Sequence, residues 1–291
     1  MPERELLTSQ RFLTGLIGAP IARSASPAMH EQAADALGAR CHYQLIEVAG
    51  AGREELRALL DGVRRLGFAG VNVTFPYKEA VVGLLDEMSP DATAIGAVNT
   101  VVVCDGRLVG YNTDTVGFSR AVAGLVTDSQ RRAVTVVGAG GVGKAIAFAL
   151  AGLGVQEIRV FDSDRAKADD LAARLRGRGI VVADSLEHAL RGAVGLVNAT
   201  PVGMLPSRGT PVPETLLHDR LWVADAVYSP LCTPLLTAAN ARGARTMTGR
   251  ELAIHQAAAA FELFTGLAPS IVEMGKAFDG VMKAQREPTG L

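Results

Sequence analysis

The stretch AVTVVGAGGVGKAIAFALAGLG, residues 133–154, limits the fold of this chain more than any other. A valine-rich run leads into glycines spaced as G-x-G-x-x-G (Gly138, Gly140 and Gly143), and an alanine-rich run follows. Strand, tight turn and helix in this order are typical of a dinucleotide-binding unit. The first glycine permits the turn, the second lets a pyrophosphate approach the backbone, and the third lets the helix pack on the strand. The phosphates then lie at the helix N-terminus, which favours anions.

The remainder of this half continues the alternation of strands and helices. Further strand-like runs cover residues 157–162, 180–184, 195–200 and 222–227. Helical segments separate most of them, and such a repeat implies right-handed crossovers and a parallel sheet. We therefore expect a Rossmann-type dinucleotide-binding domain over residues 115–251.

The first half of the chain also alternates between strand-like and helical runs. Its strand-like runs cover residues 12–18, 41–48 and 70–75, and residues 96–114 indicate a hairpin that turns at Asp105-Gly106. Helices are expected from a cap at Ser26-Pro27, over residues 54–67, from Tyr77 onward, and in the tail over residues 252–266 and 270–287.

These patterns predict an α/β protein of two domains, because 291 residues exceed what one core usually supports. The N-terminal domain, residues 1–114, is expected to hold a mainly parallel sheet and to bind substrate. The helices of residues 252–291 are expected to return to it and complete it. A catalytic site is then expected in the cleft between the domains.

Composition excludes several classes of protein. The chain has 29 basic and 30 acidic residues and no basic arm, so nucleic acid and anionic membranes are not expected partners. No apolar signal core or 18-residue apolar run occurs, and the three cysteines are odd in number and far apart. A cytoplasmic protein without a disulfide framework is expected. Histidines and cysteines lack metal-ligand spacing, so no metal site is predicted, and no G-x-S-x-G elbow for a hydrolase occurs.

Asp162 lies about twenty residues beyond the glycine turn, where a carboxylate binds the ribose hydroxyls of the adenosine. The 2′-phosphate of NADP would be repelled by Asp162 and Asp164, although Arg165 and Lys167 offset part of that charge. NAD is therefore the expected cofactor and NADP the alternative. The competing interpretation is a solvated turn with a helix cap.

Polar residues follow the ends of several strands of the first domain. Lys78 closes the run NVTFPYK, Ser24 and Ser26 follow the first strand, and further polar groups are Asn99, Thr100, Asn112, Thr113 and Asp114. Together they would suit a small polyhydroxylated carboxylate, with Lys78 and Asp114 as the titratable pair for proton transfer. The competing interpretation is a surface lysine with a capping aspartate.

Eight short blocks of the sequence resemble the blocks of one known protein family. They read GAPIARSASPAMH, NVTFPYK, GAVNT, YNTD, GAGGVGKA, NATPVGM, DAVYSPLCTPLL and HQAAAAFELFTG. In these blocks and in their order the chain resembles the shikimate dehydrogenase family, which includes the quinate/shikimate dehydrogenases. The resemblance implies that Lys78 and Asp114 are catalytic. It implies substrate contacts at Ser24, Ser26, Thr74, Asn99, Tyr228 and Gln256. It implies cofactor contacts at Gly138, Ala139, Gly140, Gly141, Val142, Gly143, Asp162, Asn198, Thr200, Met204 and Gly249.

The chain departs from the family pattern at the residues expected to bind the cofactor and at a few other positions. NADP-using members carry NRTxxRA where this chain has DSDRAKA, so Ser163 and Lys167 replace the two arginines. His30-Glu31 replaces a common His-Asn, and Leu252 stands where methionine is usual. These departures resemble the NAD-preferring quinate/shikimate branch. Ser26, however, resembles shikimate users, since quinate users often carry Thr or Gly there.

The expected activity is reversible hydride transfer between the ring hydroxyl of shikimate and NAD, which gives 3-dehydroshikimate. The alternatives are dehydrogenation of quinate or of an amino analogue. From a different class, a non-catalytic dinucleotide-binding redox sensor also fits the glycine turn, but it would need neither Lys78 nor Asp114. The sequence leaves monomer and homodimer both open.

Overall fold

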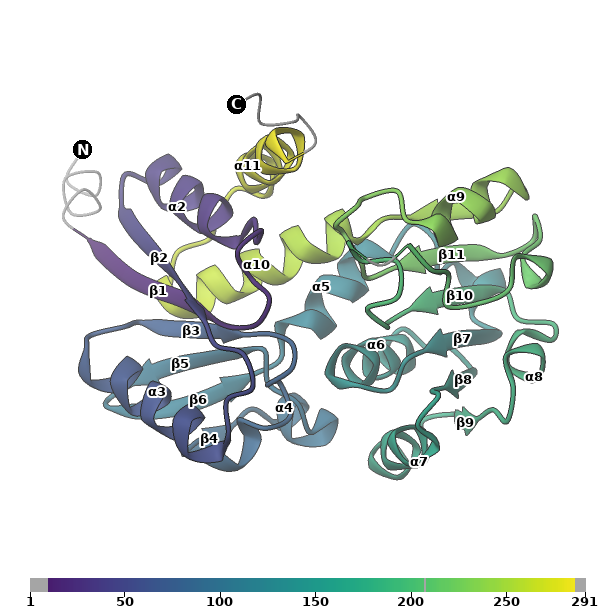
Figure 1. The fold of residues 1–291 in the computed structure, drawn as a ribbon, viewed down its shortest axis with the longest axis horizontal. Coiled ribbons are helices and arrows are strands. Elements are labelled where there is room, and N and C mark those ends of the chain that lie inside the picture. Colours follow the sequence, from purple (N-terminus) through teal and green to yellow (C-terminus); the bar gives the residue numbers. More distant parts are fainter. Residues whose placement is uncertain (1–9, 207, 286–291) are drawn as a thin grey trace. The chain divides into compact units, whose positions relative to one another are not determined.

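The computed structural model describes residues 10–206 and 208–285 and confirms the predicted α/β class (Figure 1). The chain divides into two compact units, each built on its own six-stranded sheet. The first unit comprises Met1–Thr93, Ala97–Thr113 and Ile254–Leu291. The second comprises Ala94–Gly96 and Asp114–Ala253.

The sheet of the first unit has the order β2-β1-β3-β5-β6-β4. Its strands are β1 (Arg11–Gly18), β2 (Arg40–Glu47), β3 (Gly70–Val73), β4 (Glu87–Met88), β5 (Thr100–Cys104) and β6 (Arg107–Tyr111). The pairs β1–β2, β1–β3 and β4–β6 are parallel, whereas β3–β5 and β5–β6 are antiparallel. Asp105 and Gly106 both have positive φ, as a two-residue hairpin turn requires, so the predicted hairpin is confirmed.

This topology brings several chain segments to one edge of the sheet. Parallel β1 and β3 both end there, and antiparallel β5 begins there. Strand β6 runs against β5 and so also ends at that edge. The register places Asn72 opposite Thr100, and Thr100 opposite Tyr111. The loops after β1, β3 and β6 and the residue before β5 therefore lie close together.

Helices α2 (Ser26–Ala36) and α3 (Arg53–Arg65) follow β1 and β2. Helix α3 is buried through Leu56, Leu60 and Val63, which pack with Val71 and other residues of the sheet. The tail forms α10 (Gly249–Thr265) and α11 (Ile271–Ala284), and α11 packs against α2 (Figure 1). The side-chain amide of Gln285 donates to the Arg23 carbonyl at 2.9 Å, which ties the end of the tail to the loop after β1.

Two sequence-based expectations for local structure were wrong. The expected helix from Tyr77 is a series of turns with one 3₁₀ segment, η1 (Val82–Leu84), because the chain must then extend so that β4 can pair with β6. Ser26 does not cap α2 with its side chain, since it is the first residue of the helix and Ala25 is the N-cap. The α4 helix (Pro90–Ile95) follows β4.

The second unit has the strand order β12-β11-β10-β7-β8-β9, and every pair is parallel. The strands are β7 (Ala133–Val137), β8 (Glu157–Phe161), β9 (Ile180–Val182), β10 (Gly195–Asn198), β11 (Trp222–Asp225) and β12 (Arg245–Met247). This is the strand order of a dinucleotide-binding sheet, whose switch point lies between β7 and β10. The sequence analysis missed β12.

The helices of this unit are α5 (Thr113–Ala121), α6 (Gly141–Gly152), α7 (Arg165–Arg174), α8 (Leu186–Leu190) and α9 (Pro234–Ala241). Short 3₁₀ segments η2 (Asp128–Gln130) and η3 (Glu214–Leu216) connect some of these elements. Buried side chains of β7, β8 and α6, among them Val134, Ile146 and Ile158, form its main core. That core fixes the turn between β7 and α6.

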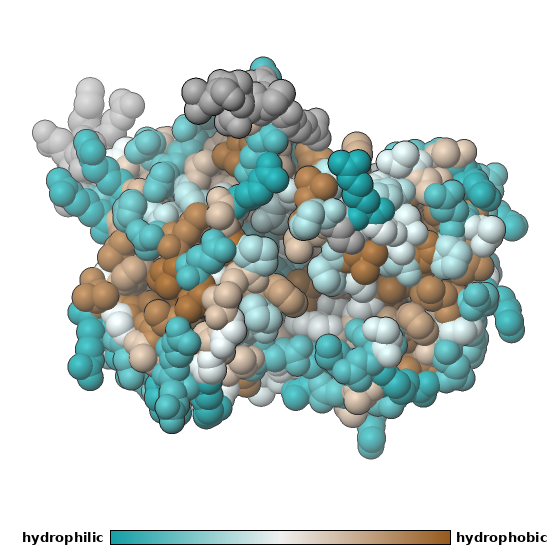
Figure 2. Space-filling view, in the orientation of Figure 1, coloured by the Kyte–Doolittle hydropathy of each residue, from teal (hydrophilic) through white to brown (hydrophobic). Residues whose placement is uncertain are grey.

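Polar and apolar residues are interspersed on the face drawn in Figure 2. The large apolar residues exposed in the described part of the chain come from different elements and are Leu66, Phe75, Val116, Val181, Leu205 and Val272. Single exposed apolar residues of this kind are ordinary on a protein surface. Within residues 10–206 and 208–285, every helix is too short or too polar to traverse a lipid bilayer.

Candidate functional site

The glycine turn between β7 and α6 has the geometry that a pyrophosphate site needs. Gly138 has φ +103°, and a Cβ there would lie 2.9 Å from the carbonyl carbon of Ala199. A Cβ on Gly143 would collide with the carbonyl oxygen of Gly138, so the first and third glycines are required by packing. A Cβ on Gly140 would meet nothing within 4 Å. The second glycine therefore leaves open space at the N-terminus of α6, where an anion is stabilised.

Asp162 follows β8 and is fixed against this turn. Its Oδ2 accepts the Ala139 N–H at 2.7 Å, and its Oδ1 accepts the Asp164 N–H at 2.8 Å. Asp164, not Asp162, caps α7, because its side chain accepts the Ala166 N–H at 3.1 Å. Each carboxylate oxygen of Asp162 keeps a second lone pair, so Asp162 has acceptors left for ribose hydroxyls.

The basic residues beside Asp162 are engaged by acidic ones. Arg165 Nε lies 3.0 Å from Asp169 Oδ1, and Arg165 Nη1 lies 2.5 Å from Asp184 Oδ1. The hydrogen bond from Arg165 holds the pKa of Asp184 below its usual range. Lys167 lies 3.9 Å from Asp164. A 2′-phosphate here would compete with three carboxylates for these two cations.

Asn198 is the last residue of β10, and its side-chain amide makes all of its hydrogen bonds to other groups of the protein. Its Nδ2 donates to Asp225 Oδ1 at 2.9 Å and to the Val202 carbonyl at 3.1 Å. Its Oδ1 accepts from the N–H and the hydroxyl of Thr200 at 3.0 and 2.7 Å. An amide side chain offers two donor hydrogens and two lone pairs, so these bonds saturate it. Asn198 therefore shapes the loop that carries Thr200 and Met204, both of them half-buried.

Asp225 ends the neighbouring strand β11 and is fully buried. It accepts from Asn198, from the Val227 N–H at 2.9 Å and from the Thr233 hydroxyl at 2.6 Å. Burial raises its pKa to about 6, and the three hydrogen bonds act against that rise. The half-buried Tyr228 follows in the same loop.

Gly249 begins α10, and a Cβ there would lie 2.6 Å from the Val227 carbonyl oxygen. Residues 198–204, 225–233 and 249 are thus brought together in the second unit.

The predicted substrate residues of the first unit gather at the sheet edge defined above. Thr74 follows β3, and its N–H donates to the Ile17 carbonyl at 2.9 Å. Asn99 precedes β5, and its carbonyl accepts the Val73 N–H at 2.8 Å. In the loop after β1, Ser24 Oγ donates to Ser26 Oγ at 3.1 Å and accepts the Ser26 N–H at 3.2 Å. Gln256 is half-buried on α10.

The predicted catalytic residues belong to different units. Lys78 is half-buried in the first unit, and its carbonyl accepts the Val98 N–H at 2.8 Å, which anchors its backbone to the residue before Asn99. Asp114 is buried in the first turn of α5. The division of the chain falls between Thr113 and Asp114, so the pairing of Lys78 with Asp114 remains a prediction.

Sequence reasoning missed three buried residues of this region: His30, Tyr43 and Asn72. Tyr43 Oη donates to Asn72 Oδ1 at 2.8 Å, and the His30 ring lies 4.6 Å from the Tyr43 ring. Asn72 stands inside NVTFPYK and His30 inside the first resemblance block. The registers of β1, β2 and β3 bring Tyr43 near Asn72, and the packing of α2 on β2 brings His30 to Tyr43.

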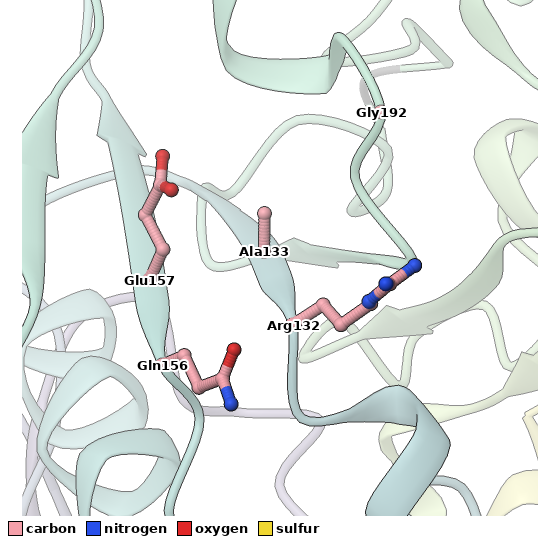
Figure 3. A pocket seen from close by; sticks show the side chains of 5 residues that line it. All are labelled: Arg132, Ala133, Gln156, Glu157 and Gly192. Atoms are coloured by element: carbon pink, nitrogen blue, oxygen red, sulfur yellow. The ribbon is translucent and has the colours of Figure 1, made fainter.

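A pocket of about 310 Å³ lies elsewhere in the second unit, lined by Arg132, Ala133, Gln156, Glu157 and Gly192 (Figure 3). Ala133 and Glu157 begin β7 and β8, whereas the glycine turn follows the end of β7. Ligands of open α/β sheets bind beyond the carboxyl ends of the strands. This pocket is at the wrong end of the sheet for the dinucleotide.

Comparisons with known proteins agree with these arrangements. Residues 16–101 match the shikimate dehydrogenase substrate binding domain, and residues 116–175 match the ThiF family. The chain is 46% identical over 276 residues to the quinate/shikimate dehydrogenase (NAD(+)) of Corynebacterium efficiens, covering 92% of this chain and 97% of the relative. It is 44% identical over 276 residues to the shikimate dehydrogenase (NADP(+)) of Streptomyces avermitilis, covering 92% and 95%.

Among solved structures, a quinate dehydrogenase from Corynebacterium glutamicum in complex with NAD superposes with a TM-score of 0.86 at 42% identity, covering 94% of this chain and all (100%) of that one. The glycine turn, the parallel sheet and these relatives define the class as an NAD(P)-dependent oxidoreductase. The chain belongs to the shikimate dehydrogenase family, so the predicted resemblance is confirmed. Its relatives include both NAD and NADP enzymes.

Proposed function

We propose that this enzyme oxidises shikimate to 3-dehydroshikimate reversibly, prefers NAD over NADP, and accepts quinate as a second substrate. The observation that carries the substrate assignment is the gathering of Thr74, Asn99 and the loop of Ser24 and Ser26 at one edge of the first sheet. Hydroxyl and amide groups in this number suit a small ring that bears hydroxyls and a carboxylate. Relatives named for shikimate and for quinate support the choice.

We assign substrate binding to residues 1–114 with 252–291, and dinucleotide binding to residues 115–251. Ser24 and Ser26 hold the carboxylate of the substrate, and Thr74, Asn99, Tyr228 and Gln256 bind the rest of it. Residues 138–143 bind the pyrophosphate, Asp162 binds the adenosine ribose, and Thr200, Met204 and Gly249 lie near the remainder of the cofactor. Asn198 acts by shaping the loop of Thr200.

NAD, when bound, would supply the acceptor for the hydride that leaves the substrate carbon. The chain must then remove the proton from the hydroxyl on that carbon. Lys78 Nζ takes this proton in oxidation and returns it in reduction, as a general acid/base. The Asp114 carboxylate accepts a hydrogen bond from a neighbouring hydroxyl of the substrate, and so orients the reacting hydroxyl toward the lone pair of the Lys78 amine.

The preference for NAD rests on Asp162 and its neighbours. Both oxygens of Asp162 accept hydrogen bonds from backbone N–H groups, which fixes the carboxylate beside the glycine turn and supports its assignment to the ribose hydroxyls. A 2′-phosphate at this place would be repelled by Asp162, and Arg165 is already held by Asp169 and Asp184. Ser163 offers no charge for that phosphate.

The proposal is tested by the rate of NADH or NADPH formation at 340 nm with shikimate, quinate and an amino analogue of shikimate, each with NAD and with NADP. We expect the highest kcat/KM with shikimate and NAD, and measurable turnover of quinate. If the cofactor is reduced only with quinate, or only with the amino analogue, that compound is the substrate and shikimate is not. No reduction in any combination would favour a dinucleotide-binding sensor.

A further inference from the structure

A chain of buried hydrogen bonds runs from β2 to the predicted substrate residues. Tyr43 Oη donates to Asn72 Oδ1 at 2.8 Å. Asn72 Nδ2 donates in turn to the Asn99 carbonyl at 3.2 Å and to Thr100 Oγ1 at 3.0 Å. Buried polar groups are costly unless they are paired, so each bond restricts the next.

The same network ends on the Asn99 side chain. Thr100 Oγ1 donates to Asn99 Oδ1 at 2.9 Å, and the Thr113 N–H donates to the same oxygen at 2.7 Å. Asn99 Nδ2 donates to Thr113 Oγ1 at 3.0 Å. The orientation of the Asn99 amide is thereby set from β5 and from the start of α5.

The side-chain amide of Asn72 has only one favourable orientation in this network. Its Nδ2 must point to the Asn99 carbonyl, because two oxygens facing each other would repel. Its Oδ1 is then left at a buried position, where the Tyr43 hydroxyl supplies a donor. Without that donor, a buried acceptor would lose its partner, which is unfavourable.

The His30 ring packs beside the Tyr43 ring and is itself next to two phenylalanine rings. It lies 4.6 Å from the Tyr43 ring and 5.9 and 6.0 Å from the rings of Phe261 and Phe264. Both ring nitrogens of His30 are buried and lack hydrogen-bond partners among the described residues. His30 thus acts on Tyr43 by packing.

We propose that Tyr43 is a positioning residue for the substrate, and that it orients Asn99 through Asn72 and Thr100. This inference rests on the proposed function, in which Asn99 binds a substrate hydroxyl. Tyr43 itself sets the direction of the amide without joining the chemistry. Its loss should therefore weaken substrate binding while leaving the dinucleotide site as it is.

The test is Tyr43→Phe, which removes one hydroxyl and keeps the ring. Tyr77→Phe is the matched control, because Tyr77 is similarly buried at 4% exposed, against 3% for Tyr43, in the same unit. Its hydroxyl donates to the Val48 carbonyl and accepts the Ala51 N–H, both at 2.8 Å, and takes no part in the network. Each variant keeps the ring and removes the hydroxyl of a buried tyrosine; Tyr43→Phe loses the donor to Asn72, whereas Tyr77→Phe loses two bonds to backbone groups.

Initial rates are measured with shikimate and NAD varied separately. For Tyr43→Phe we expect the KM of shikimate to rise about tenfold, as loss of about 1.4 kcal/mol would produce, and the KM of NAD to stay within about twofold. Tyr77→Phe should leave both KM values within about twofold. An unchanged KM of shikimate in Tyr43→Phe, or an equal rise in both variants, would overturn the proposal.

If Tyr43→Phe does not fold, Thr100→Val is a second test of the network, because it removes the hydroxyl that lies between Asn72 and Asn99. The same selective rise in the KM of shikimate is expected, and its absence would count against the network. If wild-type enzyme does not oxidise shikimate, the proposed function has failed. An active wild type with unaffected variants rejects the role of Tyr43 alone.

Discussion

Asn198 and Asp225 are joined by a buried hydrogen bond of 2.9 Å between the ends of two adjacent strands, β10 and β11. Asn198 organises the loop after β10, and Asp225 accepts from Val227 and Thr233 in the loop after β11. One carboxylate therefore holds two loops that we assign to the cofactor and the substrate.

Asp225→Ala should weaken NADH binding about tenfold, because the donors of Asn198, Val227 and Thr233 would lose their common acceptor. It should also lower the free energy of unfolding by roughly 2 kcal/mol or more. Asp225→Asn keeps one acceptor oxygen at this place and should restore most of the binding. Fluorescence titration with NADH measures the dissociation constant. Equal affinity in Asp225→Ala and wild type would show that the two loops hold their shape without Asp225.

His30 should make the protein sensitive to acid. Burial lowers its pKa from 6.5 to about 3, so the unfolded chain binds a proton that the folded chain excludes. The resulting stability is fully present above about pH 6.5 and is lost as the pH falls toward 3, at up to about 1.4 kcal/mol per pH unit.

His30→Phe removes this titration and keeps an aromatic ring against Tyr43. The free energy of unfolding of wild type minus that of the variant should therefore rise with pH between about 3 and 6.5 and be level above. Urea denaturation at a series of pH values gives this difference. Asp225 contributes a pH dependence of the opposite sign, because its pKa is raised and its contribution to stability is lost as the pH rises from 3.8 to about 6. This contribution is the same in wild type and variant, so it cancels in the difference. A difference independent of pH would mean that His30 accepts protons in the folded state.

The parts of the fold that could be predicted were those with strong local patterns. Apolar runs gave β1, β7 and β10, since such runs are typical of strands buried on both faces of a parallel sheet. Strand β12 could not be found in this way, because its three residues, Arg245–Met247, include an exposed arginine. The helix expected from Tyr77 failed because the pairing of β4 with β6 decides that segment, and pairing is not a local property.

The same limit applies to the site. Polar residues at strand ends could be predicted from the alternation alone, which is how Ser24, Asn99 and Lys78 were chosen. Tyr43 and Asn72 stand 29 residues apart, and their hydrogen bond depends on the register of three strands. The sequence also could not show that Asn198 is saturated by its own loop, since that requires the positions of Thr200, Val202 and Asp225.

Cofactor preference should respond to a change of two residues. Asp162→Asn combined with Ser163→Arg removes a negative charge and adds a cation for the 2′-phosphate, as in the NRTxxRA pattern. We expect the ratio of kcat/KM for NADP to that for NAD to rise at least tenfold. Asp162→Asn with Ser163→Gln is the control, because it has similar length without the charge. If the ratio does not move, the adenosine ribose is bound by other residues.

Lys78→Ala should lower kcat by about 10²–10⁴ and change the KM of shikimate little, because the general acid/base is lost while the binding groups remain. Lys276→Ala is the control, because this exposed lysine of α11 pairs with Glu273 on the same helix at 2.8 Å. Steady-state rates of NADH formation measure both variants. A kcat close to that of wild type in Lys78→Ala would remove Lys78 from proton transfer and leave Asp114 as the candidate.

Two glycines of α6 offer a matched test of the dinucleotide turn. A Cβ on Gly143 would collide with the Gly138 carbonyl, whereas a Cβ on Gly152, in the same helix, would meet nothing within 4 Å. Gly152→Ala should therefore raise the free energy of unfolding by about 0.4–1 kcal/mol, since alanine has fewer conformations in the unfolded chain. Gly143→Ala must push α6 away from the turn, so NADH binding should weaken at least tenfold. Thermal unfolding and NADH titration of both variants measure these effects. Unchanged NADH affinity in Gly143→Ala would mean that the close packing of α6 on the turn does not determine the pyrophosphate site.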